Sequence, residues 1–479
     1  MIRPLVHRSK QTLKTTLSSL AQRRNAKLRA LPPQLWGLDV DASGRLSLEG
    51  LDLADLTARW GSPLHVVHAA ALRRNARAFL NKEGLDEEGL DGERAPPCEV
   101  YYSYKTNPIP GVLRLLDAEG IGAEVISEYE LWLALRLGVD PACIIFNGPV
   151  KSDASLREAI GRGIALLNAN HREELARIGA IAAELGRRPV TGVRICTSAS
   201  WGGQFGAPIG NGEALATIGE ACRHPHLDMR ALHVHFGAPL RTAQQVRQLV
   251  DETLDLAHLA AQRHGFELGI LDLGGSLAIP TVQALSARDK RLNMTFLADL
   301  PAPDPERTLE IRAYVRLVRQ LVHAGCRRRG LPVPRIVLEP GRSLTGNTQM
   351  LLTTVHSLKH ATNAAPYAIL DAGINLAQSV QSEFHQIYAA TKMDATASRS
   401  YRLAGPICSP GDVLYWARSL PELAPGDTLA IMDAGAYFVP FATSFSFPQP
   451  AIVLVDDGAV HLLRRAERFE DLVLCDDPC

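Results

Sequence analysis

The sequence has few features that would direct it to a metal, a nucleic acid or a membrane. None of its eight cysteines forms a Cys-x-x-Cys pair, so we expect no structural zinc site and no other metal site. Lysine plus arginine equals aspartate plus glutamate, at 51 each, so no excess of positive charge favours nucleic acid. No run of about 18 apolar residues occurs, which argues against a membrane span. Scattered thiols are typical of the reducing cytoplasm, where we expect the protein to act.

Acidic residues are also missing from the first part of the chain. Residues 1–38 contain no aspartate or glutamate but carry several lysines and arginines. We interpret residues 1–35 as a basic N-terminal extension, which is either a surface segment or a transit peptide. No clear cleavage signal follows it, which favours the surface segment.

The rest of the chain has a soluble, globular composition and is long enough for two domains. Its 479 residues are 46% hydrophobic and 21% charged. Short apolar runs alternate with helical patterns, which predicts an α/β fold with a (β/α)8 TIM-like barrel over residues 69–345 rather than an open sheet. The eight strand-like runs are CEVYYSYK, GAEVIS, CIIFNG, IALLNAN, VTGVRIC, ALHVHFG, GILDLGG and RIVLEPG.

The pattern changes after the barrel. Short β-branched runs punctuated by turns predict a mostly β C-terminal domain over residues 346–479. We expect the strands within residues 36–68 to join this domain, because they precede the first helix of the barrel. Residues 281–307 break the alternation and are expected to form an insertion or lid near the barrel mouth.

Two motifs at predicted strand ends could carry a cofactor. Lys105 ends the run YYSYK, where burial of an amine is costly unless it is neutralised or bonded. A Schiff base with an aldehyde cofactor would resolve that cost, although a lysine that snorkels to the rim would too. The turn Gly274-Gly275-Ser276 follows another strand and exposes successive N–H groups that could bind phosphate, or it is simply a tight turn.

Further polar residues stand at strand ends and in loops. Glu339 and Arg342 flank a Pro-Gly turn, where a carboxylate could keep a ring nitrogen protonated and a guanidinium could hold a phosphate or a carboxylate, or the two could form a rim ion pair. His235 could stack on a planar ring or be an ordinary core histidine. Cys408 lies in a Pro/Gly-rich loop as a plausible reactive thiol, and Tyr437 could donate to a phosphate.

The order of these motifs resembles one enzyme family. The motifs are SYKTN, GAEVISEYEL, FNGPVKS, HVHFGA, LDLGGS, EPGR, GPICSPGD and DAGAY, and they run from about Ser62 to Pro450. In that order they are similar to the fold-type III pyridoxal-phosphate decarboxylases of the diaminopimelate, ornithine and arginine group, which have an alanine-racemase-like barrel. Within that group the sequence most resembles the diaminopimelate decarboxylase branch.

The resemblance implies pyridoxal 5'-phosphate as cofactor and decarboxylation of an amino acid as activity. By this likeness Lys105 forms the Schiff base, and Cys408, which the partner subunit places over the cofactor, returns a proton. A homodimer with two shared sites is therefore implied. The remaining matches are His235 for ring stacking, Gly274, Gly275, Ser276 and Tyr437 for phosphate, Glu339 for the pyridine nitrogen, and Arg342 for phosphate or substrate carboxylate.

The departures from the family pattern concern the substrate. Ser409 stands where the diaminopimelate enzymes have a glutamate, and our alignment puts Ala377 and Gln381 where they have an arginine and a tyrosine. Each lost partner costs about 2–5 kcal/mol if the other charge stays buried. Arg342, Ser409 and Gln381 are then the predicted substrate contacts. We therefore expect a substrate other than plain diaminopimelate, such as a siderophore or other secondary-metabolite intermediate.

Other departures are small and other activities stay open. Ala238 and Gln204 replace a usual serine and a usual basic residue near the phosphate. The alternatives are a diaminopimelate decarboxylase proper, an amino-acid racemase on the same fold, or a non-catalytic homologue that binds a partner protein. The presence of both Lys105 and Cys408 speaks against the non-catalytic homologue.

Overall fold

The protein is described by a computed structural model that covers residues 30–81, 96–200, 203–361 and 364–476. These residues form two compact units. The first, called here the barrel unit, contains residues 72–278 and 306–345, and the second, called the β unit, contains the rest. The predicted basic extension lies almost wholly outside the described residues. Within the described residues no helix is both long and apolar enough to cross a membrane.

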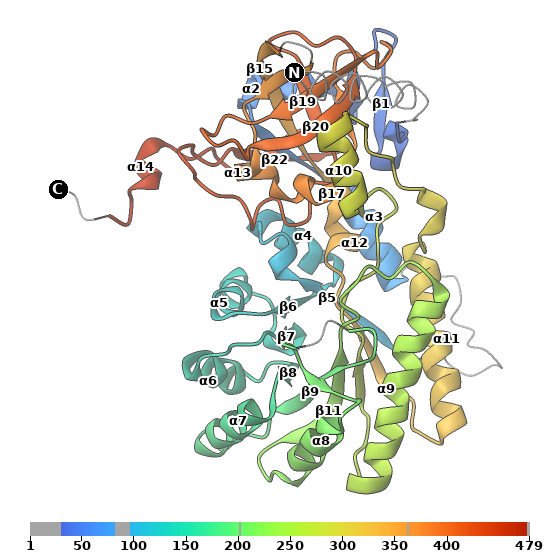
Figure 1. Ribbon diagram of the computed structural model, residues 1–479. Helices are drawn as coiled ribbons and strands as arrows, with labels where there is room; N and C mark the ends of the chain where they lie inside the picture. The colour runs from blue at the N-terminus through green and yellow to red at the C-terminus, as the bar shows by residue number, and fades with distance from the viewer. Residues whose placement is uncertain (1–29, 82–95, 201–202, 362–363, 477–479) are drawn as a thin grey trace, which may run out of the picture. The chain divides into compact units, whose positions relative to one another are not determined.

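The barrel unit is built on a closed ring of parallel strands. Each strand pairs with the next, and the last pairs with the first, so the ring has no open edge (Figure 1). This confirms the predicted barrel. The ring consists, in order, of β5 (Cys98–Ser103), β6 (Gly122–Val125), β7 (Ile144–Phe146), β8 (Leu166–Ala169), β9 (Val190–Cys196), β11 (Asp228–Val234), β12 (Ile270–Asp272) and β14 (Arg335–Leu338), and the short β10 (Ala207–Pro208) pairs beside β9.

Helices surround this ring, as Figure 1 shows for α5 to α8. Several begin at a side-chain cap: Ser127 and Ser152 accept backbone N–H groups at the starts of α5 and α6, and Thr242 forms a capping box on α9. The helices are α3 (Ala69–Leu80), α4 (Pro110–Glu119), α5 (Glu128–Leu137), α6 (Asp153–Arg162), α7 (Arg172–Glu184), α8 (Glu213–Arg223), α9 (Ala243–His264), α11 (Ile311–Arg329) and the short α12 (Arg342–Thr345).

The interior of the barrel has an apolar layer followed by a polar one. One buried cluster consists of Tyr101, Ile145, Leu166, Ala231, Ile270 and Val337. Side chains on a strand repeat direction every second residue, so the positions two further along face the same interior. Those positions are Ser103, Asn147, Asn168, His233, Asp272 and Glu339, and all of them are buried. The polar residues that carry chemistry therefore lie toward the carboxyl ends of the strands.

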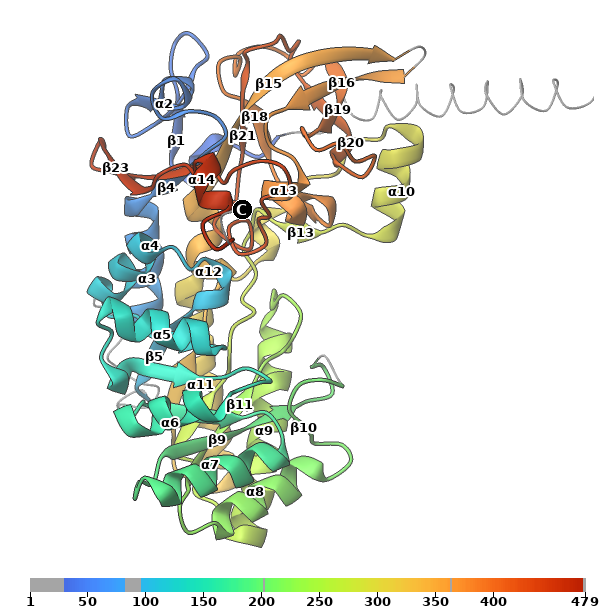
Figure 2. The ribbon, with the colours of Figure 1, turned by 90° about the vertical axis from the view of Figure 1, so that its left-hand side faces the viewer.

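The β unit is a mixed sheet in the order β20-β19-β16-β15-β4-β22-β23, and its long strands β15 and β16 run side by side in Figure 2. The strands are β15 (Gln349–Ala361), β16 (Ala364–Leu370), β19 (Arg399–Ala404), β20 (Val413–Leu420), β22 (Ala451–Asp456) and β23 (Ala459–Arg464). Smaller elements are β17 (Glu383–Phe384), β18 (Ile387–Ala389), β21 (Thr428–Ile431), α13 (Ile374–Ala377) and α14 (Phe469–Leu472).

The chain before the barrel joins this sheet, as predicted. Strand β4 (Leu64–His68) pairs antiparallel with β15 and parallel with β22. Ahead of it come β1 (Leu38–Val40), β2 (Leu46–Leu48), β3 (Leu51–Asp52) and α2 (Leu53–Trp60). Their buried leucines share one hydrophobic cluster with the C-terminal strands, which explains why sequence-distant segments form one unit.

The segment that breaks the alternation also belongs to the β unit. Residues 279–305, with β13 (Gln283–Ala284) and α10 (Ala287–Phe296), cluster with it. Asn293 anchors the segment to β20: its Nδ2 donates to the Ala417 carbonyl at 2.8 Å and its Oδ1 accepts from the Trp416 N–H at 3.0 Å. An insertion read from sequence as part of the barrel is thus held by hydrogen bonds to a distant strand.

Candidate active site

Lys105 lies in the single 3-10 turn Tyr104–Thr106 that follows β5. Its side chain is 38% exposed, and its Nζ is 3.7 Å from Oε2 of the buried Glu124. Glu124 Oε2 also accepts from the Ser103 hydroxyl, and Glu124 Oε1 accepts from Asn147 at 3.0 Å. The amine is therefore accessible yet held beside a fixed negative group, a setting suited to a reacting amine.

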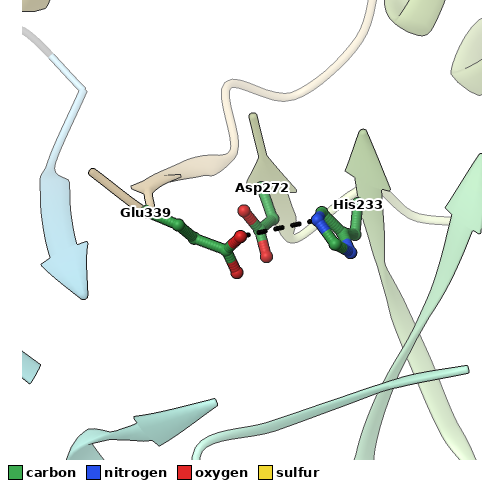
Figure 3. A group of neighbouring side chains, drawn as sticks. All are labelled: His233, Asp272 and Glu339. Carbon is green, nitrogen blue, oxygen red and sulfur yellow. Dashed lines mark ion pairs between the residues drawn. The ribbon is translucent and has the colours of Figure 1, made fainter. Parts of the chain in front are cut away.

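A buried group of titratable side chains is formed by His233, Asp272 and Glu339, which come from neighbouring strands and point toward one another (Figure 3). Their exposures are 2%, 0% and 3%. The distance from His233 Nε2 to Glu339 Oε2 is 3.5 Å, an ion-pair contact longer than a good hydrogen bond. Ligand-type atoms of all three lie within 4.8 Å of one another, so the expectation that the protein holds no metal stays a prediction.

The two carboxyl groups differ in charge state. Burial raises the pKa of the Asp272 carboxyl, and the charge of Glu339 raises it further. Burial also acts upward on the pKa of Glu339, but the neighbouring His233, Asp272 and Lys105 outweigh it and hold that pKa below its usual range. Two adjacent buried carboxyl groups cannot both ionise cheaply, so Asp272 keeps the proton and Glu339 is the anion.

Two asparagines tie the polar layer together. Asn147 Nδ2 donates to Glu339 Oε1 at 2.6 Å as well as to Glu124. Asn168 Nδ2 donates to Asn147 Oδ1 at 2.9 Å and to Asp272 Oδ2 at 3.0 Å. The network connects the carboxylate beside Lys105 to the carboxylate of Glu339, and its shared hydrogen bonds hold the two groups in a fixed relation.

His235 lies one step beyond β11, beside the glycine turn. Burial is the main cause that lowers the pKa of its ring to about 3, so the imidazole is neutral. Its Nδ1 accepts from the Gly237 N–H at 3.0 Å, and its Nε2 is 3.2 Å from the Ser276 hydroxyl. A neutral, oriented ring is suited to stacking against a planar ligand.

The turn Gly274-Gly275-Ser276 requires its glycines. Gly274 has φ +62°, and a Cβ at Gly275 would stand 2.5 Å from the Glu339 carbonyl oxygen. Ser276 also has positive φ, at 91°. Gly274 and Ser276 thus have left-handed conformations on either side of Gly275, and a turn of this kind can form an anion-binding concavity from its backbone N–H groups.

The EPGR turn lies against the loop that carries Lys105. A Cβ at Gly341 would stand 2.3 Å from the Thr106 hydroxyl oxygen, and the Ser103 N–H donates to the Pro340 carbonyl at 3.2 Å. Arg342, half-buried, starts α12 directly after this turn. The close approach brings two motifs together that lie more than 200 residues apart in the chain.

The remaining predicted residues lie in the β unit. Cys408 is exposed and free in a tight loop before β20. The buried Asp412 pins this loop, because its Oδ2 accepts from the Ile407 N–H and its Oδ1 from the Ile374 N–H, both at 2.8 Å. Gln381 Nε2 donates to the carbonyls of Gly411 and Val413, at 2.8 and 3.0 Å.

Ser409 and Tyr437 complete the β-unit set. The Ser409 hydroxyl accepts from the Gly411 N–H at 3.3 Å, within the same loop as Cys408. Tyr437 has φ 68°, a left-handed conformation that is uncommon outside glycine, and its ring stacks on Phe441 at 5.6 Å. A left-handed backbone at Tyr437, the predicted phosphate-binding tyrosine, is consistent with a functional constraint.

The structure adds residues to which the motifs assigned no role in the site: Glu124, Asn147, Asn168, Asp272 and Asp412. All but Asp412 belong to the polar layer or touch it. The residues of the layer could have been found from the alternation along each strand run, because most of the runs carry a polar residue two positions after a buried apolar one. That signal becomes specific only when the ring closes and the polar positions face one interior.

The donor set of the barrel fits pyridoxal phosphate. Lys105 offers an accessible amine, Glu339 a buried anion, and the glycine turn a cradle that a Cβ would fill. Both ring nitrogens of His233 are buried without a hydrogen-bond partner among the described residues, so the polar layer has capacity left. An aromatic ring nitrogen that bears a proton would find a carboxylate there.

Comparisons with known proteins agree with this assignment. Residues 91–346 match the family model of the pyridoxal-dependent decarboxylases, pyridoxal binding domain. The chain is 31% identical to a diaminopimelate decarboxylase of Pseudomonas aeruginosa over 441 residues, covering 89% of this chain and 95% of that protein. A second relative, the diaminopimelate decarboxylase of Methanothermobacter thermautotrophicus, is 29% identical, and the match covers 91% of this chain and 96% of that protein.

Solved structures show the same fold. A diaminopimelate decarboxylase from M. jannaschii in complex with L-lysine superposes with a TM-score of 0.80 at 25% identity, covering 92% of this chain and 98% of that chain. The chain belongs to the pyridoxal-dependent decarboxylases, carboxy-lyases that act on amino acids and use pyridoxal phosphate as cofactor.

Proposed function

We propose that the protein removes the α-carboxylate of an amino acid, with Lys105 as the residue that carries the cofactor and Cys408 as the proton donor. The observation that carries this proposal is the buried network that links Glu124, beside the Lys105 amine, to Glu339 through Asn147. An accessible amine and a buried anion at the two ends of one rigid network match the two ends of the cofactor's reactive system.

The bound cofactor supplies an aldehyde that condenses with amines and a ring that accepts the electron pair of a broken bond. Lys105 would hold the cofactor through its amine at the end of β5 and so position the reacting centre. Glu339 holds a proton at the ring nitrogen. His235 packs as a neutral ring. In the turn Gly274–Ser276 the Gly274 N–H is held by Asp272, and the N–H groups of Gly275 and Ser276 are offered to phosphate.

Further contacts are proposed for Arg342 and Tyr437. The guanidinium of Arg342 can take a phosphate or the substrate carboxylate through two parallel N–H donors. The hydroxyl of Tyr437 can donate to phosphate. The left-handed backbone of Tyr437 supports such a role, because strain of this kind is kept only where the surroundings demand it.

Cys408 is the proposed donor of the proton to Cα. Its thiol is exposed in one chain, in a loop that Asp412 and Gln381 hold in place. An exposed thiol on a rigid loop is suited to completing the site of a second copy, so the proposal includes a homodimer with shared sites. Free cysteines are compatible with the cytoplasm as the place of action.

The proposed substrate is an amino acid other than plain diaminopimelate. Gln381 donates its amide N–H groups to the loop backbone, and the Ser409 hydroxyl accepts from the Gly411 N–H. Neither side chain brings a charge to a distal ammonium or carboxylate. A larger or neutral distal group, such as that of a siderophore or other secondary-metabolite precursor, fits this lack of charge.

Diaminopimelate itself is the second candidate, because the named relatives are diaminopimelate decarboxylases. The test is carbon dioxide release from meso-diaminopimelate, ornithine, arginine, lysine and amino acids with neutral extended side chains, with pyridoxal phosphate added. We expect turnover in the last group. A kcat/KM for meso-diaminopimelate above about 10⁴ M⁻¹s⁻¹ would overturn the substrate proposal, and loss of chirality without carbon dioxide would identify a racemase.

The cofactor assignment has its own test. Borohydride reduction of the cofactor-loaded protein, followed by peptide mass spectrometry, should find the adduct on Lys105. An adduct on any other lysine, or none, refutes the assignment.

A further inference from the structure

The buried pair of His233 and Glu339 suggests a role for a histidine that the motifs leave unassigned. His233 is on β11, two residues before the stacking candidate His235, and so faces the barrel interior. Figure 3 shows its ring directed at the Glu339 carboxylate, with Asp272 between them in the view. All three side chains are almost completely removed from water.

The hydrogen bonds of the three side chains are unequal. Asp272 accepts two hydrogen bonds, at Oδ1 from the Gly274 N–H and at Oδ2 from Asn168 Nδ2, both at 3.0 Å. Glu339 accepts one strong bond from Asn147 at 2.6 Å. Among the described residues the ring of His233 has no hydrogen-bond partner. The imidazole is therefore directed at one group only, the carboxylate of Glu339.

Other titratable or charged side chains surround Glu339, and each has a different main contact. Lys105 is paired with Glu124, and the Arg194 guanidinium lies over the Phe205 ring at 4.6 Å. His235 is neutral, because burial lowers the pKa of its ring to about 3. The titratable or charged groups that face Glu339 are thus His233, Asp272, Lys105, Arg194, His235 and, through Asn147, Glu124.

We propose that His233 is a positioning residue that keeps Glu339 ionised and fixes its orientation, while Asp272 takes the proton that the two carboxyl groups share. The inference rests on the proposed function, because it assigns the support of the carboxylate that serves the cofactor's ring nitrogen. His233 touches neither cofactor nor substrate in this scheme. Replacement of His233 removes a group that lowers the pKa of Glu339, so Glu339 takes up a proton more readily and loses its hold on the ring nitrogen.

The first test uses the protein without cofactor, so that it does not depend on catalysis. Carboxyl carbons of glutamate are labelled with ¹³C, and Glu339→Gln identifies the Glu339 resonance. We expect this carboxyl to stay ionised at every pH at which the wild-type protein is folded, and His233→Gln to bring its protonation into that range. A Glu339 carboxyl that is protonated at neutral pH in the wild type overturns the proposal without any variant.

The second test uses the loaded enzyme. His233→Gln should lower kcat by about 10- to 100-fold, the range for a residue that supports a functional ligand, with KM nearly unchanged. The pH dependence of the cofactor absorbance should shift in this variant and not in the matched control His258→Gln, at a partly exposed histidine of α9. Unchanged kcat and absorbance in a folded His233→Gln protein refutes the role.

Chemical rescue separates charge from packing. In His233→Ala, added imidazole should restore kcat below about pH 7, where imidazole is protonated, and less at higher pH. Equal rescue at all pH values refutes the charge effect. If borohydride finds no adduct on Lys105, the proposed function fails, yet the carboxyl titration still decides whether His233 governs Glu339.

Discussion

Two lysines that follow barrel strands differ in how accessible their amines are. Lys105 comes directly after β5, is 38% exposed and lies 3.7 Å from Glu124. Lys151 follows β7 and is 0% exposed. Its Nζ donates to the carbonyls of Gly148 and Asn168, both at 3.0 Å, and to Glu174 Oε1 at 3.1 Å.

The difference lies in how the ammonium group is satisfied. Lys151 uses all three donors in a fully buried site, so its amine is fixed in place. Burial lowers the pKa of this amine despite the charge of Glu174. Lys105 keeps access to solvent and one close acidic neighbour. A structural lysine is saturated and enclosed, whereas a reacting lysine must be held yet reachable.

The largest expected effect is on activity at Lys105. Lys105→Ala should reduce kcat by roughly four orders of magnitude, the scale of losing a covalent catalytic group. Its free energy of unfolding should change by less than about 1 kcal/mol, because the side chain is half-exposed. Carbon dioxide release and urea unfolding measure the two quantities. Retained turnover would remove the distinction between the lysines.

Lys151 should show the reverse pattern. Lys151→Met leaves Glu174 as an unpaired buried charge and should lower the free energy of unfolding by about 3–5 kcal/mol. The folded fraction should keep a kcat within about tenfold of wild type. The double variant Lys151→Met/Glu174→Leu should recover most of the stability. A loss that the double variant does not reduce would show that the pair itself is not the cause.

The surroundings of Lys105 should also show a pH dependence of stability. Burial, aided by the charge of Glu124, raises the pKa of Glu130 to about 7, close to the Lys105 corner. The folded state therefore binds this proton more tightly than the unfolded state, so its stabilisation is complete below about pH 4.5 and is lost as pH rises toward 7. Relative to Glu130→Gln, the wild type should lose about 3 kcal/mol over this window.

Denaturant unfolding of both proteins at several pH values checks this prediction. The substitution keeps an oxygen for the Ile126 N–H, which Glu130 Oε2 accepts at 2.8 Å. A difference between the two proteins that does not vary with pH would place the titration elsewhere.

The smallest expected effects come from the helix caps next to each lysine. Ser127 caps α5 near Lys105, and Ser152 caps α6 next to Lys151. Ser127→Ala and Ser152→Ala should each cost about 1 kcal/mol of stability, with kcat unchanged within twofold. Thermal unfolding measures the cost. A large loss of activity in only one of them would show that its cap also positions catalytic groups.

Much of the barrel was predictable because its signals are local. Runs such as CIIFNG and VTGVRIC are short, apolar and followed by helical patterns, and each became a strand of the ring. Lys105, Glu339 and His235 could be placed at strand ends for the same reason. Their roles stay predictions, since a strand end says where a side chain is and not what it does.

Other features depended on contacts between distant segments. Residues 279–305 join the β unit through the bonds of Asn293 to β20, more than 100 residues away. No local pattern contains such a partner. In the same way, Lys151 stands in a quoted motif, but its burial depends on Glu174 and Asn168.

The amino-acid sequence by itself determined the alternation of strand and helix, the residues at the strand ends and the family to which the chain belongs. These follow from periodicity and motif order, which are properties of neighbours along the chain. Only the tertiary structure decided that His233, Asp272, Glu339 and the two asparagines form one buried layer, and that one lysine is locked while the other is reachable. Closure of the ring brings these side chains together in a site of low dielectric, where charge and protonation depend on every neighbour at once.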